Sequence, residues 1–289
     1  SIPLERVSRI EIIRGGRGSV LYGDNAAGGV INIITKEGIG KPNAELVLSA
    51  GSYGTFKTDM NAGGSLKDFA LQFTGNYFTS DGYRDNSKTD SIDLGLNISY
   101  YVKDFMRIGF STGYHKDHTG LPGALKESDF AAGALRTDSK FPNDFSETED
   151  YYFMLSPEVY LWGENVLRLD ASFRKRDFSS FSSGDWGNFT GSSDINTALL
   201  SPRVIFKQDV AGIKNTLTAG IDYQKADNDI LNDSLFFGTR SIGVFDLKKE
   251  DIGYFAHDEV NITDSLRISG GYRHDRARFS FQPSTPESV

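Results

Sequence analysis

The chain has 289 residues, no cysteine and a formal net charge of −8, with 31 basic and 39 acidic side chains interleaved along it. The absence of cysteine excludes a disulfide framework and a thiolate metal site, and the mixed charge argues against nucleic acid as the main partner. No run approaches the roughly 18 consecutive apolar residues that a membrane helix requires, so a helical membrane protein is excluded.

The first forty residues predict a small mixed α/β unit. Pro3 fits the first turn of a short helix that ends near Ser8, and Arg9–Arg14 (RIEIIR) alternates as a strand that Gly15 and Gly16 end. Two further elements follow, a helical turn over Ser19–Tyr22 and a short strand over Val30–Lys36.

Two glycines, Gly28 and Gly29, stand directly before the second of these strands in SVLYGDNAAGGVINIIT, residues 19–35. Glycine tolerates a sharp bend or a close approach of two backbones. The pair therefore predicts a tight turn at this point.

From about residue 44 onward, side chains alternate between apolar and polar with a period of two. In FALQFTGNY, Phe69, Leu71 and Phe73 share one face while Gln72 lies on the other. The 31 glycines, 21 phenylalanines and 13 tyrosines also favour extended structure. The pattern predicts eleven strands, at about 44–51, 55–64, 69–79, 91–102, 105–115, 150–162, 166–178, 195–208, 215–226, 250–262 and 265–280.

The connections between these strands are short at one end and long at the other. Lys67-Asp68 and Lys103-Asp104 are short turns, whereas long polar loops are predicted at about 79–90, 115–148, 179–194 and 227–249. This asymmetry, together with strands of about 10 to 14 residues, favours an outer-membrane barrel over a soluble sandwich or propeller. An open sheet would leave unpaired edges in lipid, so we expect further strands beyond this sequence or on a second chain.

The run LERVSRIEIIRGGRGSVLYGDNAAGGVINIITK, residues 4–36, resembles the C-terminal half of the plug domain of TonB-dependent outer-membrane receptors. Residues 250–276, EDIGYFAHDEVNITDSLRISGGYRHDR, resemble barrel strands of the same family. Gly16 departs from the family pattern, which usually has proline there. The resemblance implies an all-β fold, an antiparallel transmembrane barrel with about 11 of an expected 22 strands in this chain. It further implies a plug part over residues 1–43 and the N-terminal half of the barrel over 44–289.

The resemblance also implies a function, the uptake of a scarce metal chelate across the outer membrane of a bacterium. A ferric siderophore is the first expectation, cobalamin or another large nutrient is the alternative, and a passive porin is the alternative of another class. The implied partners are the TonB–ExbB–ExbD complex, outer-membrane lipid and lipopolysaccharide. No intrinsic cofactor is implied.

Ligand recognition in the family falls to the plug apex and the loops. On that basis Tyr83, Arg84, Trp186 and Phe189 are candidate ligand-binding residues, because aromatic rings stack on flat chelates and arginine pairs with anionic ones. The plug motif of the resemblance maps onto Arg14, Gly15, Tyr22, Gly23, Asn25, Gly28, Gly29 and Asn32.

Catalytic chemistry is not predicted, because the four histidines have no nucleophile motif beside them. Metal binding is a weaker possibility than an ordinary polar surface. The stretch YHKDH offers His115 and His118 as ligands, and the loop TSDGYRDNSKTD offers Asp81, Asp85 and Asp90 to calcium.

Overall fold

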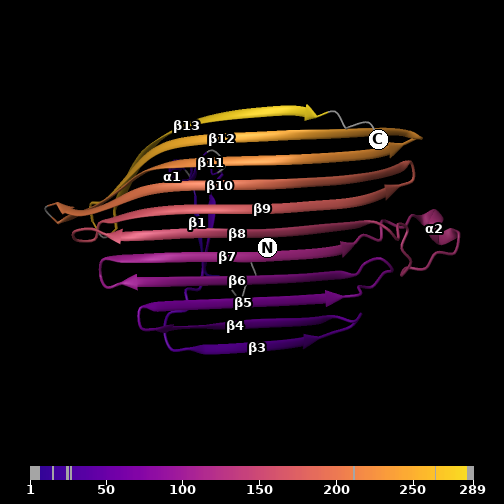
Figure 1. Ribbon diagram of the computed structural model, residues 1–289, viewed down its shortest axis with the longest axis horizontal. Coiled ribbons are helices and arrows are strands. Elements are labelled where there is room, and N and C mark those ends of the chain that lie inside the picture. Colours follow the sequence, from indigo (N-terminus) through magenta and orange to yellow (C-terminus); the bar gives the residue numbers. More distant parts are fainter. Residues whose placement is uncertain are drawn as a thin grey trace.

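A single antiparallel sheet of eleven strands dominates the computed structural model, which describes residues 7–14, 16–23, 26, 28–210, 212–263 and 265–284 (Figure 1). Each strand pairs with the next along the chain, so the order runs without a crossover. All eleven predicted strands are present. They are β3 (Asn43–Ala50), β4 (Phe56–Leu66), β5 (Phe69–Ser80), β6 (Thr89–Val102), β7 (Met106–Gly120), β8 (Phe145–Tyr160), β9 (Val166–Gly184), β10 (Gly187–Val210), β11 (Ile213–Phe236), β12 (Thr239–Asn261) and β13 (Arg267–Ser284).

The N-terminal segment forms a separate hairpin of β1 (Val7–Ile13) and β2 (Val30–Thr35), with the short helix α1 (Gly16–Tyr22) between them. The predicted helix that ends near Ser8 is wrong where it can be tested, because Val7 and Ser8 belong to β1. The alternation of the strand extends back to Val7, which pairs with Thr35. Residues 1–6 lie outside the described part of the chain. No helix of the described residues is long and apolar enough to cross a membrane.

The two glycines before β2 have different roles. Gly29 has a φ of +127°, and a Cβ at this position would lie 2.9 Å from the carbonyl oxygen of Ile13 on β1. A side chain is therefore excluded by both conformation and space. Nothing lies within 4 Å of a Cβ at Gly28, so the close approach belongs to Gly29 alone.

The two faces of the large sheet differ in chemistry, as the alternation predicted. One face presents Phe69, Leu71 and Leu94 to the outside, and Leu94 is 38% exposed. The opposite face, here called the inner face, is contacted by the N-terminal segment and holds buried polar groups, among them Gln72, Thr74, Asp93, Ser99, Asp150, Asp170 and Ser201.

This arrangement is the reverse of a soluble fold. In the described residues, the only buried hydrophobic side chains are Ala26, Ala70 and Phe255. A soluble sandwich would instead bury its apolar face against a second sheet. The apolar outer face needs an apolar surrounding, which is what a lipid bilayer supplies.

The strands are longer than predicted at one end of the sheet. The predicted loops 179–194 and 227–249 are wrong, because β9 and β10 continue to a turn at Asp185-Trp186 and β11 and β12 to a turn at Phe237-Gly238. These hairpins lie on the right in Figure 1, beside the helix α2 (Glu127–Ala131). The extensions mix apolar residues with many polar ones and lack a regular alternation, so hydrophobic periodicity gives no clear signal there although the backbone ladder continues.

A charge on the outer face tests this assignment. We expect Leu94→Arg to impair assembly, because a cation facing lipid near the bilayer midplane costs ~2–4 kcal/mol. The measurement is the heat-modifiable gel mobility of the folded barrel in outer-membrane fractions. Leu235→Arg, in the long β11–β12 hairpin, is the matched control and should assemble normally. Normal assembly of Leu94→Arg would reverse the inside–outside assignment.

Candidate functional site

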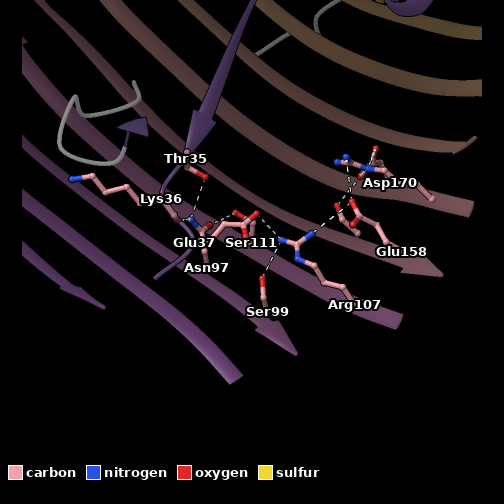
Figure 2. A network of polar contacts seen from close by, with 11 residues as sticks. Thr35, Lys36, Glu37, Asn97, Ser99, Arg107, Ser111, Glu158 and Asp170 are labelled. Carbon is pink, nitrogen blue, oxygen red and sulfur yellow. Dashed lines mark hydrogen bonds and ion pairs between the residues drawn. The ribbon is translucent and has the colours of Figure 1, made fainter. Parts of the chain in front are cut away.

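The chain that follows β2 is bonded to the inner face of the sheet. Asn97 of β6 donates from Nδ2 to the carbonyl oxygen of Lys36 at 2.8 Å and to Oγ1 of Thr35 at 3.2 Å (Figure 2). Arg107 of β7 donates from Nη2 to Glu37 at 2.9 Å and to Ser99 at 3.0 Å. The side-chain amide of Asn97 and the guanidinium of Arg107 thus attach the end of β2 and the residues after it to the wall.

Arg107 is buried enough for its charge to need partners. Its side chain is 16% exposed, and Nη1 lies 3.7 Å from Glu158 on β8. Glu158 in turn faces Arg168 of β9 at 3.4 Å. These three residues occupy directly opposed positions on neighbouring strands, so the backbone register sets the alternation of charge.

The alternation continues across the inner face. Arg168 and Asp170 are 3.0 Å apart, and Arg203 of β10 lies 3.5 Å from Asp170. Ser201 links Arg203 to Asp222 of β11, which pairs with Arg273 of β13 at 2.6 Å. We call this row the polar belt; it consists of Arg107, Glu158, Arg168, Asp170, Ser201, Arg203, Asp222 and Arg273.

The far end of the polar belt contacts the N-terminal segment a second time. Arg273 donates from Nη1 to the carbonyl oxygen of Val20 in α1 at 3.4 Å. At the end of α1, Gly23 has a φ of +84°, and a Cβ there would lie 3.2 Å from Arg273. Glycine thus both ends the helix and lets it approach the wall. The segment is therefore fixed at both ends of one continuous row of charges.

A polar cavity of 810 Å³ lies between the β1–β2 hairpin and the wall formed by β6 to β9. Glu11 and Asn32 line it from the hairpin and are joined by a 3.2 Å hydrogen bond. Arg107, Glu158 and Tyr160 line it from the wall. The space beside the Glu37–Arg107 pair thus has polar groups on both sides.

Comparisons with known proteins place this architecture. No family model matches the chain. The vitamin B12 transporter BtuB of Photobacterium profundum is 29% identical over 171 residues, which are 52% of this chain and 27% of that protein. The ferrichrome outer membrane transporter/phage receptor of Escherichia coli is 21% identical over 321 residues, covering 94% of this chain and 42% of that protein. The unliganded ferric citrate transporter FecA has the same fold, with a TM-score of 0.84, 16% identity, and coverage of 98% of this chain and 45% of that structure.

The chain is a relative of the TonB-dependent outer-membrane receptors. It spans less than half the length of the relatives and the structure just quoted. Its eleven strands correspond to part of a receptor β-barrel, which confirms the predicted fold class. Those proteins are named as transporters and receptors, not as enzymes.

The receptor motif of the sequence maps onto the N-terminal segment. Gly23 and Gly29 serve close backbone approaches, whereas Gly28 and Tyr22 are exposed. Asn32 bonds Glu11 within the hairpin, and Arg14 is exposed after β1. Gly15 and Asn25 lie outside the described residues. The transport role of these positions stays a prediction.

The guanidinium of Arg84 is already hydrogen-bonded within the chain. It donates to the carbonyl oxygens of Pro122, Gly123 and Asp138. Asn86 makes similar bonds to the carbonyls of Leu121, Phe141 and Asp144. These two side chains therefore organise the loop 121–144, and a direct contact of Arg84 with a ligand stays a prediction.

The three aromatic candidates lie on two separate parts of the long end. Tyr83 meets Tyr53 edge-on with ring centroids 5.8 Å apart. Trp186, 67% exposed at the tip of the β9–β10 hairpin, stacks on Phe237 of the neighbouring hairpin at 5.3 Å. Phe189 lies on β10, within the stretch 179–194 that the sequence predicted as a loop. Their role in ligand binding stays a prediction.

The five weak metal candidates do not form one set of ligands. His115 lies between Asp93 and Asp117, each at 2.8 Å, and His118 stacks on Phe145 at 5.6 Å between ring centroids. Asp90 accepts a hydrogen bond from Thr79 and pairs with Lys88. The backbone N–H groups of Asp81 and Asp85 donate to the carbonyl oxygens of Tyr53 and Thr137. Within the described residues, no three His, Asp or Glu side chains gather as a metal ion would need.

The sequence missed Glu37 and the partners within the polar belt. Arg107, Arg168 and Arg273 were visible as charges on the polar face of strands, which was a real signal. Their pairing was not visible, because it depends on the register of strands far apart in the chain.

A cluster of charges ties the loop 121–144 to the tip of the β9–β10 hairpin, at the end of the sheet where the long hairpins extend. Asp185 of the hairpin tip pairs with Lys126 and, at 3.1 Å, with Lys140, which also faces Asp129 at 3.3 Å. The hydrogen bonds from Lys126 and then Lys140 hold the pKa of Asp185 below its ordinary value of 3.8. The contact between loop and hairpin is therefore charged at neutral pH.

Removing the cation at the end of the polar belt should loosen the N-terminal segment. Arg107→Ala leaves Glu37 without the guanidinium that faces it, which we expect to weaken the attachment by about 1–3 kcal/mol. Limited proteolysis of the folded protein should then cleave residues of the segment faster. Arg9→Ala, which breaks the exposed Arg9–Glu11 pair in the same segment, is the control and should change the rate little. Equal rates for both variants would contradict an anchoring role for Arg107.

Acid should release the loop from the hairpin tip. The folded pKa of Asp185 is lowered, so its contribution is full above pH 3.8 and is lost as the pH falls from there through the lowered value. We expect the fluorescence of the adjacent Trp186 to change in that window and Asp185→Asn to abolish the change. The same titration in both proteins would contradict this assignment.

Proposed function

We propose that the chain forms the plug part over residues 1–43 and the first half of the barrel over 44–289 of an outer-membrane importer. Its substrate is a metal chelate, a ferric siderophore in the first place. The observation that carries the proposal is the N-terminal segment on the inner face, bonded at Glu37 and Val20 to a charged wall whose outer face is apolar. The relatives named for ferrichrome, ferric citrate and vitamin B12 support this substrate class.

In this proposal the parts have separate tasks. The apolar outer face contacts outer-membrane lipid and lipopolysaccharide, and the N-terminal segment obstructs the lumen. The polar belt holds the segment until an external source of energy displaces it. By the resemblance to TonB-dependent receptors, that source is the TonB–ExbB–ExbD complex. A barrel wall by itself converts no energy.

Two alternatives differ in their use of the N-terminal segment. A passive porin would have an open lumen, and the double attachment of the segment to the wall argues against it. A cobalamin receptor would share the whole architecture, so the ligand alone separates it from a siderophore receptor. No catalytic step and no resident cofactor form part of the proposal, and calcium in the loop of Asp81, Asp85 and Asp90 remains a proposal without a gathered ligand set.

Uptake by cells that carry the receptor containing this chain tests the function. We expect iron-starved cells to accumulate ⁵⁵Fe supplied as a siderophore complex, and to lose that uptake when the TonB complex is deleted. Labelled cyanocobalamin supplied in parallel distinguishes the alternative substrate. Uptake that continues without the TonB complex would contradict the proposal and favour a passive pore.

A further inference from the structure

We propose that Arg174 and Arg176 on the inner face of β9 form an anion-binding subsite, which selects chelates with negative charge. The inference rests on the proposed function and deepens it, because it names the charge class of the substrate. It concerns residues distinct from the loop candidates Tyr83, Arg84, Trp186 and Phe189.

The two arginines lie on the inner face, beyond the polar belt toward the long hairpins. Asp170, Ser172, Arg174 and Arg176 alternate along β9 and therefore share one face, and Asp170 is buried on the inner face. A cavity of 370 Å³ lies there, lined by Tyr152, Arg174 and, from the end of β2, Thr35. The cavity is thus bounded both by the wall and by the N-terminal segment.

Arg174 is held in one orientation by a buried carboxylate. Its Nε donates to both oxygens of Asp150 at 3.0 Å, and Nη2 donates to the same group. Asp150 is 8% exposed in its side chain whereas Arg174 is 54% exposed, so the guanidinium covers the carboxylate and keeps an accessible edge. A guanidinium fixed in this way binds a second anion with little further loss of side-chain freedom.

Arg176 supplies the positive charge that is not already neutralised. It is exposed, and in the described part of the chain no carboxylate pairs with it. Its neighbours across the strands are Asp150, which is engaged by Arg174, and Ile195 of β10, which carries no charge. Arg176, one step along the same face from Arg174, therefore adds a positive charge that no carboxylate neutralises.

The carboxylates beside the cavity already have hydrogen-bond partners, so they compete less for the two arginines. Gly113 of β7 lines the cavity and stands directly opposite Tyr152, so β7 adds no side chain at this position. The carboxylates of Asp93 and Asp117 are bonded to His115, 2.8 Å from each. Arginine forms charge-assisted hydrogen bonds with anionic oxygens, and these bonds are stronger than those between neutral groups.

Binding of chelates that differ in charge tests the inference. The purified receptor containing this chain is titrated with ferric enterobactin and ferric citrate, which are anionic, and with neutral ferrichrome and cationic ferrioxamine B, and quenching of tryptophan fluorescence is recorded. We expect an anionic chelate to bind most tightly and Arg176→Gln to weaken it roughly tenfold, as loss of one charge-assisted bond predicts. Arg267→Gln, the same change near the short-turn end of the sheet, is the matched control and should leave the affinity unchanged.

A second variant guards against a folding defect at the cavity. Arg174→Gln would leave Asp150 buried without its cation, so Arg174→Gln is combined with Asp150→Asn, and this double variant should also weaken the anionic chelate. Tightest binding of ferrichrome or ferrioxamine B, or anionic affinities that neither set of substitutions alters, would overturn the subsite and leave the proposed function intact. If none of the four chelates binds, the proposed function fails and the inference falls with it.

Discussion

The constraint on which this structure depends is the need to pair charges on the inner face of the sheet. A charge removed from water is costly unless an opposite charge or several hydrogen bonds compensate it. Arg107, Glu158 and Arg168 meet this need by facing one another across three strands. A shift of register by one residue would turn these charges toward the apolar side and the leucines inward, so the pairing and the hydrophobic pattern specify the same register.

The N-terminal segment satisfies groups that the wall alone leaves open. Glu37 gives Arg107 a second carboxylate, and the carbonyl of Val20 accepts from Arg273. Gly23 lets the end of α1 lie close to Arg273, and Gly29 lets β2 begin close to Ile13 of β1. The segment is consequently attached by polar bonds in a hydrophilic space rather than by an apolar core. Such an attachment can break and form again without exposing hydrophobic surface, which suits a part that must move.

The sequence predicted the fold well because the alternation of apolar and polar side chains can be seen within each short stretch of sequence. A period of two and the turn residues are sufficient to locate eleven strands, and the contrast of Phe69 and Leu71 with Gln72 orients them. The prediction failed where this alternation is absent. Above the apolar band both faces of a hairpin meet water, so the extensions around Trp186 and Phe237 read as loops although their backbones pair.

The site was less predictable for a related reason. Arg84 was recognised as a chemically useful residue, but its guanidinium is used by carbonyls of residues 122–138, and no local pattern records that contact. Glu37 gave no signal, since a lone glutamate after a strand is ordinary. Long-range pairs of this kind follow from the register of the sheet, which the sequence specifies only through the whole fold.

The cavity beside Arg174 and the Glu37–Arg107 attachment of the N-terminal segment lie at different positions along the inner face. Thr35 takes part in both regions. Thr35 lines the cavity beside Arg174, and its hydroxyl accepts from Asn97, which also holds the carbonyl of Lys36. Lys36 is followed by Glu37, the partner of Arg107. An occupant of the cavity would therefore touch the chain two residues before the attachment that keeps the segment on the wall. Contact alone does not transmit a signal, because coupling requires that the occupant bind one position of the segment better than another. The structure supplies the physical element for such a difference, a short stretch of chain whose polar bonds to the wall lie next to the cavity.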